Sequence, residues 1–271
     1  MSQPHTRPHL QSDAPPRSLS SSLQEHRFGR TELIIGSDGI EYLQNCHIAV
    51  LGAGGVGGYA IEALTRAGIG QLTLIDNDTF SLTNINRQLH ATDDTIGRVK
   101  VDVVAQRCRL INPRVQINTI VQRYSEDNAA TILQPDFDYV LDCIDTISAK
   151  IDLIQRCTDR QLPIISSMGS GNKLDPTKVV IADLFHSQNC RLARILRKEL
   201  RRRGVTSGVP VVYSTELYRQ PRQNTPTKPR VSGENWQQPP LGSISTIPAL
   251  FGLMMAGKVI QQFTEKFNDT L

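Results

Sequence analysis

Apolar runs and segments of helical periodicity alternate along the first two thirds of the chain. A buried strand is predicted by the β-branched apolar run at 47–52, and further strands are predicted at 71–76, 115–120, 137–145 and 162–167. Helices are predicted by the periodic segments at 31–45, 57–69, 98–112 and 148–160. Strands that alternate with helices indicate an α/β fold, with a Rossmann-like, doubly wound, mostly parallel sheet and right-handed crossovers.

The pattern changes near residue 178. A strand at 178–184 is followed by a basic amphipathic helix at 191–204 and by another strand at 209–215. Residues 218–240 contain too much Pro, Gln and Asn to build a core, which predicts a mobile crossover loop. The last periodic segment predicts a C-terminal helix at 243–265.

We expect a single domain at 23–271, with the basic helix and the loop as an insertion at 184–240, behind a disordered Pro- and Ser-rich leader at 1–22. The leader has no apolar h-region, which argues against a secretory signal. The apolar stretch 247–260 is too short to span a membrane and carries Lys258, so it packs on the domain or lies at an interface. The sequence thus predicts a soluble, cytoplasmic protein.

Charge and cysteine content narrow the function classes only slightly. A formal net charge of +4 over 271 residues hints at an anionic partner, although proteins that bind no nucleic acid often carry as much. The five cysteines are widely spaced and form no CxxC pair; they are Cys46, Cys108, Cys143, Cys157 and Cys190. This spacing argues against a disulfide framework, and we expect no structural zinc.

A glycine-rich turn joins the first predicted strand to the following helix. Gly52, Gly54 and Gly57 fit the G-x-G-x-x-G pattern, which lets backbone N–H groups and a helix N-terminus approach phosphate oxygens. Asp76 ends the second strand, where a carboxylate can bind ribose hydroxyls. We infer a nucleotide site, with a glycine-rich packing turn as the alternative.

The residues after Asp76 distinguish between nucleotides. Arg87 and Lys100 follow the second strand, and an NAD site has no general need for two cations there. A nucleoside triphosphate that is cleaved between its α and β phosphates does need them. Asp145, at the end of the strand at 137–145, suits magnesium bound together with phosphate oxygens, and its alternative role is to cap the next helix.

Several motifs, in this order and spacing, resemble the ThiF-type adenylating enzymes related to the ubiquitin-activating enzyme. They are RFGRTELIIG at 27–36, GAGGVGG at 52–58, LIDND at 74–78, LTNINRQ at 82–88, IGRVK at 96–100 and VLDCIDT at 140–146. The resemblance covers about 23–183. Within this group the chain looks most like the branch that dehydrates threonylcarbamoyladenosine at position 37 of tRNA.

The resemblance implies a role for each matching residue. The turn at Gly52, Gly54, Gly55 and Gly57 would hold the phosphates of ATP, and Asp76 the ribose. Further phosphate contacts would come from Asn84, Arg87 and Gln88, with Lys100 at the α-phosphate. Asp145 would place Mg²⁺.

The resemblance also implies a tRNA substrate and a homodimer with a shared active site. In the wider group an arginine of the N-terminal segment reaches the ATP site of the partner subunit, and Arg30 occupies the matching place, with Arg27 nearby. The alternative is that both arginines are solvated surface residues. A sulfur-transfer partner accompanies some members of the family, but nothing in these residues indicates one.

The basic helix at 191–204 is the second candidate for contact with RNA. Leu192, Ile195, Leu196 and Leu200 share one face, which predicts that this face docks on the domain. The other positions carry Arg191, Arg194, Arg197, Lys198, Arg201, Arg202 and Arg203. More cations lie in the loop, at Arg219, Arg222, Lys228 and Arg230. Phosphate contacts and a merely solvated face are both consistent with this density of charge.

Other functions remain open at this stage. An activator of a sulfur-carrier or ubiquitin-like protein would share the fold, but the zinc-binding CxxC pairs of the molybdopterin and thiamine activators are absent. Cys190 lies where a carrier thiol could sit, yet no base is evident beside it and ring closure needs no covalent carrier. The remaining alternatives are an NAD-dependent oxidoreductase and a non-catalytic, nucleotide-dependent RNA-binding module.

Overall fold

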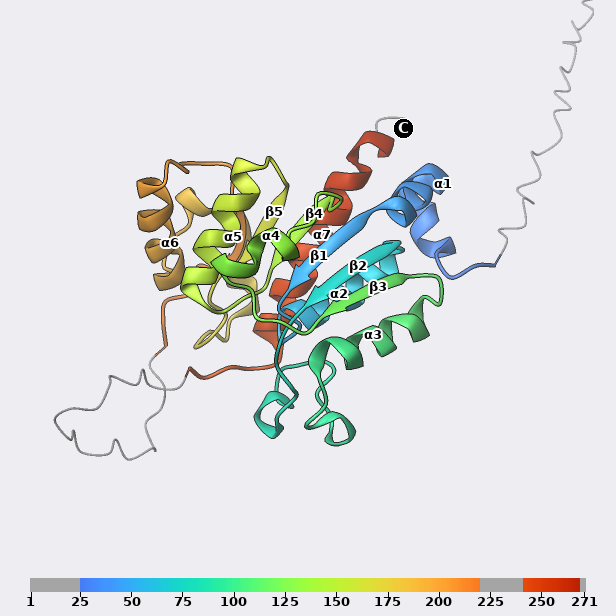
Figure 1. Cartoon of the computed structure of the whole chain (residues 1–271), viewed down its shortest axis with the longest axis horizontal. Coiled ribbons are helices and arrows are strands. Elements are labelled where there is room, and N and C mark those ends of the chain that lie inside the picture. Colours follow the sequence, from blue (N-terminus) through green and yellow to red (C-terminus); the bar gives the residue numbers. More distant parts are fainter. Residues whose placement is uncertain (1–24, 220–240, 269–271) are drawn as a thin grey trace, which may run out of the picture.

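One sheet organises the part of the chain that the structure describes. The structure is a computed structural model, which describes residues 25–219 and 241–268, so the expected leader and residues 220–240 of the expected loop lie outside it. The sheet has the strand order β3-β2-β1-β4-β5-β7-β6 (Figure 1). Its strands are β1 His47–Leu51, β2 Gln71–Ile75, β3 Gln116–Ile120, β4 Tyr139–Asp142, β5 Ile164–Ser167, β6 Val179–Asp183 and β7 Pro210–Ser214. Only the edge strand β6 is antiparallel to its neighbour, which confirms the predicted fold class.

The register brings the ends of four strands to one edge. Leu51 at the end of β1 pairs with Ile75 of β2 on one side and with Asp142 of β4 on the other. Ile75 in turn pairs with Ile120, the last residue of β3. The turns that follow these strands therefore lie side by side at the carboxyl edge, where open α/β sheets bind their ligands.

Helices cover both faces of the sheet (Figure 1). Their bounds are α1 Gly29–Asn45, α2 Gly57–Ala67, α3 Lys100–Ile111, α4 Ala129–Ile132, α5 Ile147–Asp159, α6 Arg191–Arg202 and α7 Thr246–Asn268. Buried side chains of α1, α2, α3 and α7 belong to one hydrophobic cluster, and those of α4, α5 and α6 belong to a second. Sequence periodicity missed the short helix α4. It also missed the break inside α1, where Gly36 has a φ of 73°.

The C-terminal helix α7 is a core element. Ile247, Phe251, Met255, Val259 and Phe263, spaced four residues apart, are all buried in the first cluster. Gly252 allows close packing on the start of α2, since a Cβ there would lie 2.2 Å from the carbonyl oxygen of Val56. Within the described ranges, no helix is long and apolar enough to cross a membrane.

The basic helix α6 docks by a narrower face than its sequence predicts. Ala193, Leu196 and Leu200 are buried, and Leu192 is partly buried. Ile195 is 40% exposed, so its assignment to the docking face was wrong. The side chain of Arg197 is also partly buried, because it donates to the carbonyl oxygens of Leu184 and Ser187. A narrow face made of Ala193, Leu196 and Leu200 is therefore enough to pack α6 against the second cluster.

Candidate functional site

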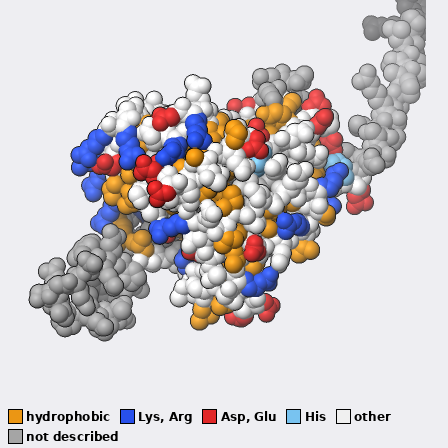
Figure 2. Space-filling view, in the orientation of Figure 1, with side chains coloured by type: hydrophobic (Ala, Val, Ile, Leu, Met, Phe, Trp, Pro, Cys, Tyr) orange, Lys and Arg blue, Asp and Glu red, His pale blue; other side chains and the backbone are white. Residues whose placement is uncertain are grey.

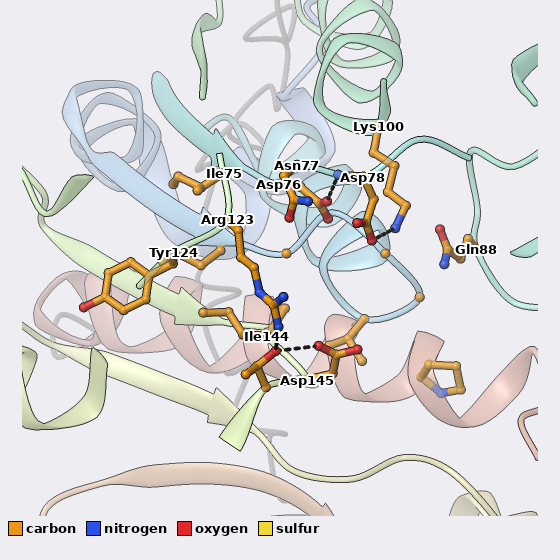
Figure 3. A pocket seen from close by; sticks show the side chains of 18 of the residues that line it. Ile75, Asp76, Asn77, Asp78, Gln88, Lys100, Arg123, Tyr124, Ile144 and Asp145 are labelled. Carbon is orange, nitrogen blue, oxygen red and sulfur yellow. Dashed lines mark hydrogen bonds and ion pairs between the residues drawn. The ribbon is translucent and has the colours of Figure 1, made fainter. Parts of the chain in front are cut away.

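A cavity of about 430 Å³ lies at the carboxyl edge of the sheet (Figure 3). The turns after β1, β2, β3 and β4 form most of its wall, and the start of α7 completes it. It brings together most of the residues singled out in the sequence: Gly52, Gly54, Gly55, Asp76, Arg87, Gln88, Lys100 and Asp145. Arg27, Arg30, Gly57 and Asn84 are not among its lining residues.

The glycines of the first turn are required by close backbone contacts. Gly52 has a φ of 96°, and a Cβ there would lie 2.7 Å from the carbonyl oxygen of Cys143. A Cβ on Gly57 would lie 1.7 Å from the carbonyl oxygen of Gly52. No side chain caps the N-terminus of α2, although the N–H of Gly58 donates to the carbonyl oxygen of Gly54 at 2.9 Å, and the positive end of the helix dipole favours an anion in the cavity.

Asp76 joins the first two turns. Its Oδ2 accepts a hydrogen bond of 2.7 Å from the backbone N–H of Ala53, and its Oδ1 accepts one of 2.8 Å from the backbone N–H of Asp78. The carboxylate is thereby fixed at the cavity wall.

Lys100 is the buried cation of the cavity. Its backbone begins α3, and its Nζ lies 2.8 Å from Oδ2 of Asp78. The lysine side chain is 7% exposed, whereas that of Asp78 is 59% exposed. A phosphate oxygen could therefore replace Asp78 beside the ammonium group. Asp78 was not among the predicted site residues, although the LIDND motif contains both Asp76 and Asp78.

Arg87 and Gln88 come from the loop between β2 and α3. The guanidinium group of Arg87 donates to the carbonyl oxygen of Thr83 at 2.8 Å and to Oδ1 of Asn86 at 3.0 Å. Gln88 is buried, and its Oε1 has no hydrogen-bond partner in the described part of the chain. A buried amide oxygen without a hydrogen-bond donor is unfavourable. If the amide N and O positions of Gln88 are exchanged, the NH₂ group takes this place and can donate to a polar ligand in the cavity. Asn84 instead closes its own turn by accepting from the N–H of Ser81.

Asp145 projects from the turn between β4 and α5. Its Oδ1 accepts a bond of 3.4 Å from Oγ1 of Thr146, which in turn accepts from Nη2 of Arg123 at 2.8 Å (Figure 3). Thr146 is the N-cap residue of α5, and Asp145 caps no N–H group of that helix. The carboxylate is exposed to the cavity and holds no cation partner in the structure, so it fits one ligand position of Mg²⁺.

Arg123 is a lining residue that the sequence reasoning missed. It follows β3, and its bond to Thr146 reaches the turn after β4. Since β2 and β1 lie between these strands, the segment after β3 and the side chain of Arg123 together span the ends of both. The available signal was its position directly after a predicted strand. Ser170, Ser243 and Pro248 were also missed, because they reach the cavity from the crossover after β5 and from the start of α7.

The strand residue Asp142 lies behind the cavity. Both Asp142 and Lys150 are fully buried, with 2.8 Å between Oδ2 and Nζ. Ser166 on β5 donates to the same carboxylate at 2.5 Å, and the N–H of Ile144 donates at 3.2 Å. This network braces the turn that carries Asp145.

The two N-terminal arginines lie away from this cavity. Arg27 donates to the carbonyl oxygen of Ile111 at 2.5 Å and lines a second cavity of about 390 Å³ between α1, α2 and α3. Arg30 is exposed on the first turn of α1.

Burial disfavours the thiolate form of two cysteines, Cys108 and Cys157. Burial raises the pKa of Cys108 to about 11 and that of Cys157 to about 12. Sγ of Cys190 accepts a bond of 3.5 Å from the N–H of Ala193 and thereby caps α6. No group of three or more His, Cys, Asp or Glu residues within 25–219 and 241–268 is arranged to hold a metal ion.

Basic side chains gather over α6 (Figure 2). Arg194, Lys198, Arg201 and Arg203 are exposed. Arg191 is held by the ring of Tyr218, with 4.2 Å between the guanidinium carbon and the ring centroid. Arg202 pairs with Glu199 at 2.9 Å.

Comparison with known proteins identifies the family. The family model described as "ThiF family" matches residues 28–271. The chain belongs to the ThiF family. Among ThiF relatives, the tRNA threonylcarbamoyladenosine dehydratase of Bacillus subtilis is 40% identical over 87% of this chain and 93% of its own length. That of Haemophilus influenzae is 36% identical over 89% of this chain and 95% of its own.

A solved ThiF structure gives the same result. The tRNA N6-threonylcarbamoyladenosine dehydratase of Escherichia coli in complex with ATP superimposes with a TM-score of 0.80 at 32% identity, covering 90% of this chain and 96% of that chain. The predicted relationship to the dehydratase branch of the family is thus confirmed.

Proposed function

We propose that this protein is an ATP-dependent tRNA threonylcarbamoyladenosine dehydratase. The observation that carries the proposal is the 40% identity to such an enzyme over nearly the whole of both chains. The cavity supports it, because a glycine-rich turn, a buried lysine and an arginine converge where a nucleotide would lie. A carboxylate of the modified base would attack the α-phosphorus of ATP and release pyrophosphate. The neighbouring carbamoyl group would then close the ring on the activated carbonyl and expel AMP.

The cavity residues have distinct roles in this reaction. The turn from Gly52 to Gly57 and the N-terminus of α2 bind the phosphates, and Asp76 binds the ribose. Lys100 stabilises the charge that develops at the α-phosphate, since its buried ammonium group lies at the cavity wall, where a phosphate oxygen can replace Asp78 beside it. Arg87 and Gln88 bind the phosphates of ATP that lie beyond the α-phosphate.

Asp145 would hold magnesium. The donor set fits, because this ion takes one or two carboxylates together with phosphate oxygens and water. When bound, the ion would neutralise charge on the departing pyrophosphate. The bond from Arg123 through Thr146 orients the carboxylate toward the cavity.

We further propose a homodimer in which Arg30 acts on the cavity of the partner subunit. The position of Arg30 on an exposed turn outside its own cavity supports this arrangement. The test is to mix Arg30→Ala and Lys100→Ala subunits and to allow exchange. Each mixed dimer then holds one complete site, so activity should return that neither variant has alone. If Arg30 acted within its own chain, mixing would restore nothing.

The tRNA would contact the exposed cations of α6. Arg194→Ala and Lys198→Ala should each weaken tRNA binding and reduce the slope of log K against log salt by about one, the value for one lost phosphate contact. Arg202→Ala is the matched control, since Arg202 already pairs with Glu199. An unchanged slope in the first two variants would remove this surface from the proposal.

The decisive experiment measures AMP release and the nucleoside product together. The protein is incubated with ATP, Mg²⁺ and either tRNA that carries threonylcarbamoyladenosine or the same tRNA without it. AMP should form only with the modified tRNA, and its nucleoside should lose the mass of one water. AMP formation without that mass loss would contradict the proposal. Carrier proteins with a Gly-Gly tail would then be the substrates to test.

A further inference from the structure

The segment just before α7 forms one wall of the nucleotide cavity. Ser243 and Pro248 line the cavity, and a Cβ on Gly55 would lie 3.3 Å from the Cβ of Pro248. In Figure 1 the start of α7 lies at the carboxyl edge of the sheet, close to the start of α2. The N-termini of both helices therefore meet at this cavity.

Asn172, in the crossover after β5, holds this segment from one side. Its Oδ1 accepts a bond of 2.7 Å from the N–H of Gly242, and its own N–H donates to the carbonyl oxygen of Gly242 at 2.8 Å. Its carbonyl oxygen accepts a bond of 3.3 Å from the N–H of Arg219. The residue is 9% exposed and adopts a φ of 57°, a conformation that Asn tolerates better than most residues.

Asn86 holds the same segment from the other side. Its Nδ2 donates to the carbonyl oxygen of Ser243 at 3.0 Å, and its Oδ1 accepts from Nη1 of Arg87 at 3.0 Å. Hydrogen bonds thus run from Asn172 through the backbone of Gly242 and Ser243 to Asn86, and from there to Arg87. This set of contacts is called the asparagine relay below.

We propose that Asn172 and Asn86 are positioning residues for the pyrophosphate half of ATP, an inference that rests on the proposed function. Asp76 marks the ribose end of the cavity, and Gly54 and Gly55 mark the phosphates. Beyond Gly55 stand Pro248 and Arg87, so the terminal phosphates lie against the surfaces that the asparagine relay fixes. Groups held in place before the reaction need no reorganisation as charge develops, and residues behind them supply that order.

Asn172→Gly is the variant that separates positioning from backbone strain. Glycine adopts a φ of 57° freely, so the substitution removes the side-chain bond to Gly242 without forcing the backbone to move. We expect ATP to bind roughly tenfold more weakly, the value for about 1.4 kcal/mol. AMP, which lacks the terminal phosphates, should bind within about twofold of the wild-type value. Isothermal titration calorimetry with ATP and with AMP, both with Mg²⁺, measures the two affinities.

The matched control is Gln161→Gly. Gln161 also has a positive φ, of 55°, but it is exposed and lies between α5 and β5, at the opposite end of the sheet. This variant should leave both affinities unchanged. Asn86→Ala should reproduce the loss for ATP, and the double variant with Asn172→Gly should lose less than the sum of the two single effects, because the residues act in one connected network.

The outcomes separate the asparagine relay from the proposed function. Equal weakening of ATP and AMP, or no weakening of either, would overturn the positioning role while leaving the dehydratase proposal intact. Turnover assays on the same preparations add a second readout, in which the KM for ATP should rise more than kcat falls. Wild-type protein that binds ATP but does not change the modified tRNA would remove the proposed substrate, and the ATP and AMP affinities would still decide the role of the asparagine relay. Wild-type protein that binds no ATP would overturn both.

Discussion

Lys100–Asp78 and Lys150–Asp142 are ion pairs with the same N–O distance of 2.8 Å, but they have different surroundings. Asp78 is 59% exposed, and Lys100 faces a cavity. Lys150 and Asp142 are fully buried, and Ser166 completes their hydrogen bonds. A ligand can replace Asp78 beside Lys100, whereas no ligand can reach Asp142. The same residue types therefore provide an exchangeable cation in one place and a fixed brace behind Asp145 in the other.

Removal of the buried lysine should produce the largest effect. Lys150→Met leaves Asp142 as an unpaired buried charge, so the free energy of unfolding should fall by about 3–5 kcal/mol. Urea denaturation followed by circular dichroism measures this loss. The double variant Lys150→Met with Asp142→Asn should recover most of it, since no charge then remains buried. A loss below about 1 kcal/mol in the single variant would show that the pair is not sealed from water.

Removal of the cavity lysine, Lys100, should have the opposite result, with a large loss of activity and little loss of stability. Lys100→Ala should change the free energy of unfolding by less than about 1 kcal/mol, because its partner is largely exposed. AMP formation should fall by about 10²–10³-fold, the usual effect of removing one group that stabilises developing charge. Single-turnover assays and urea denaturation on one preparation test both statements. Lys178→Ala, at an exposed lysine outside the cavity, should leave both quantities unchanged.

Asp78→Asn tests the exposed ion pair by changing its acidic residue instead of its lysine. If ATP displaces Asp78 from Lys100, a neutral residue there should make ATP bind more tightly. The gain should stay below about fivefold, because an exposed ion pair contributes only about 0.2–1 kcal/mol. Calorimetric titration measures the affinity, and weaker binding would show that Asp78 itself contacts the nucleotide or its metal ion.

A third ion pair, Arg219–Glu216, should give the smallest effect, which shows in how stability depends on pH. Burial opposes ionisation of Glu216, but Arg219 and the N–H groups of Asp175 and Leu174 outweigh it and lower the pKa to about 2. A lowered pKa means that the folded state releases this proton more readily than the unfolded chain, so its contribution is full above pH 4.5 and is lost as pH falls toward 2. Glu216→Gln should therefore lower the free energy of unfolding at neutral pH, lose that effect as the pH falls toward 2, and flatten the pH dependence between 4.5 and about 2.

Periodicity predicted the strands and the six long helices well, because most of them bury a regular set of apolar residues; the edge strand β3, which buries none of its residues fully, was found from its apolar run alone. It missed α4 and the break at Gly36, since four residues carry no period and a single glycine within a helical pattern does not reveal its φ. The docking face of α6 was drawn too wide. Where basic residues surround an apolar stripe, spacing alone does not show which apolar residue stays exposed, as Ile195 does.

The cavity was predictable where motifs follow the ends of strands, as at Gly52, Asp76 and Asp145. Arg123 shares that location but belongs to no motif, and its reach across two strands depends on the sheet order. Asn172 and Ser243 could not be found in this way, because their proximity depends on how the crossover after β5 meets the start of α7. The role of Arg30 stays a prediction that the subunit-mixing experiment addresses, and the role of Asp145 stays a prediction.

The packing of α7 on α2 also has a consequence for synthesis of the protein on the ribosome. The cavity joins a turn that begins at Gly52 to Pro248 in the last helix, and Gly252 fits against Val56 only when that helix is in place. Strands β1 to β5 can emerge and pair while this wall is still missing. This wall of the cavity is therefore completed only near the end of translation, and a nascent or C-terminally truncated chain would lack it.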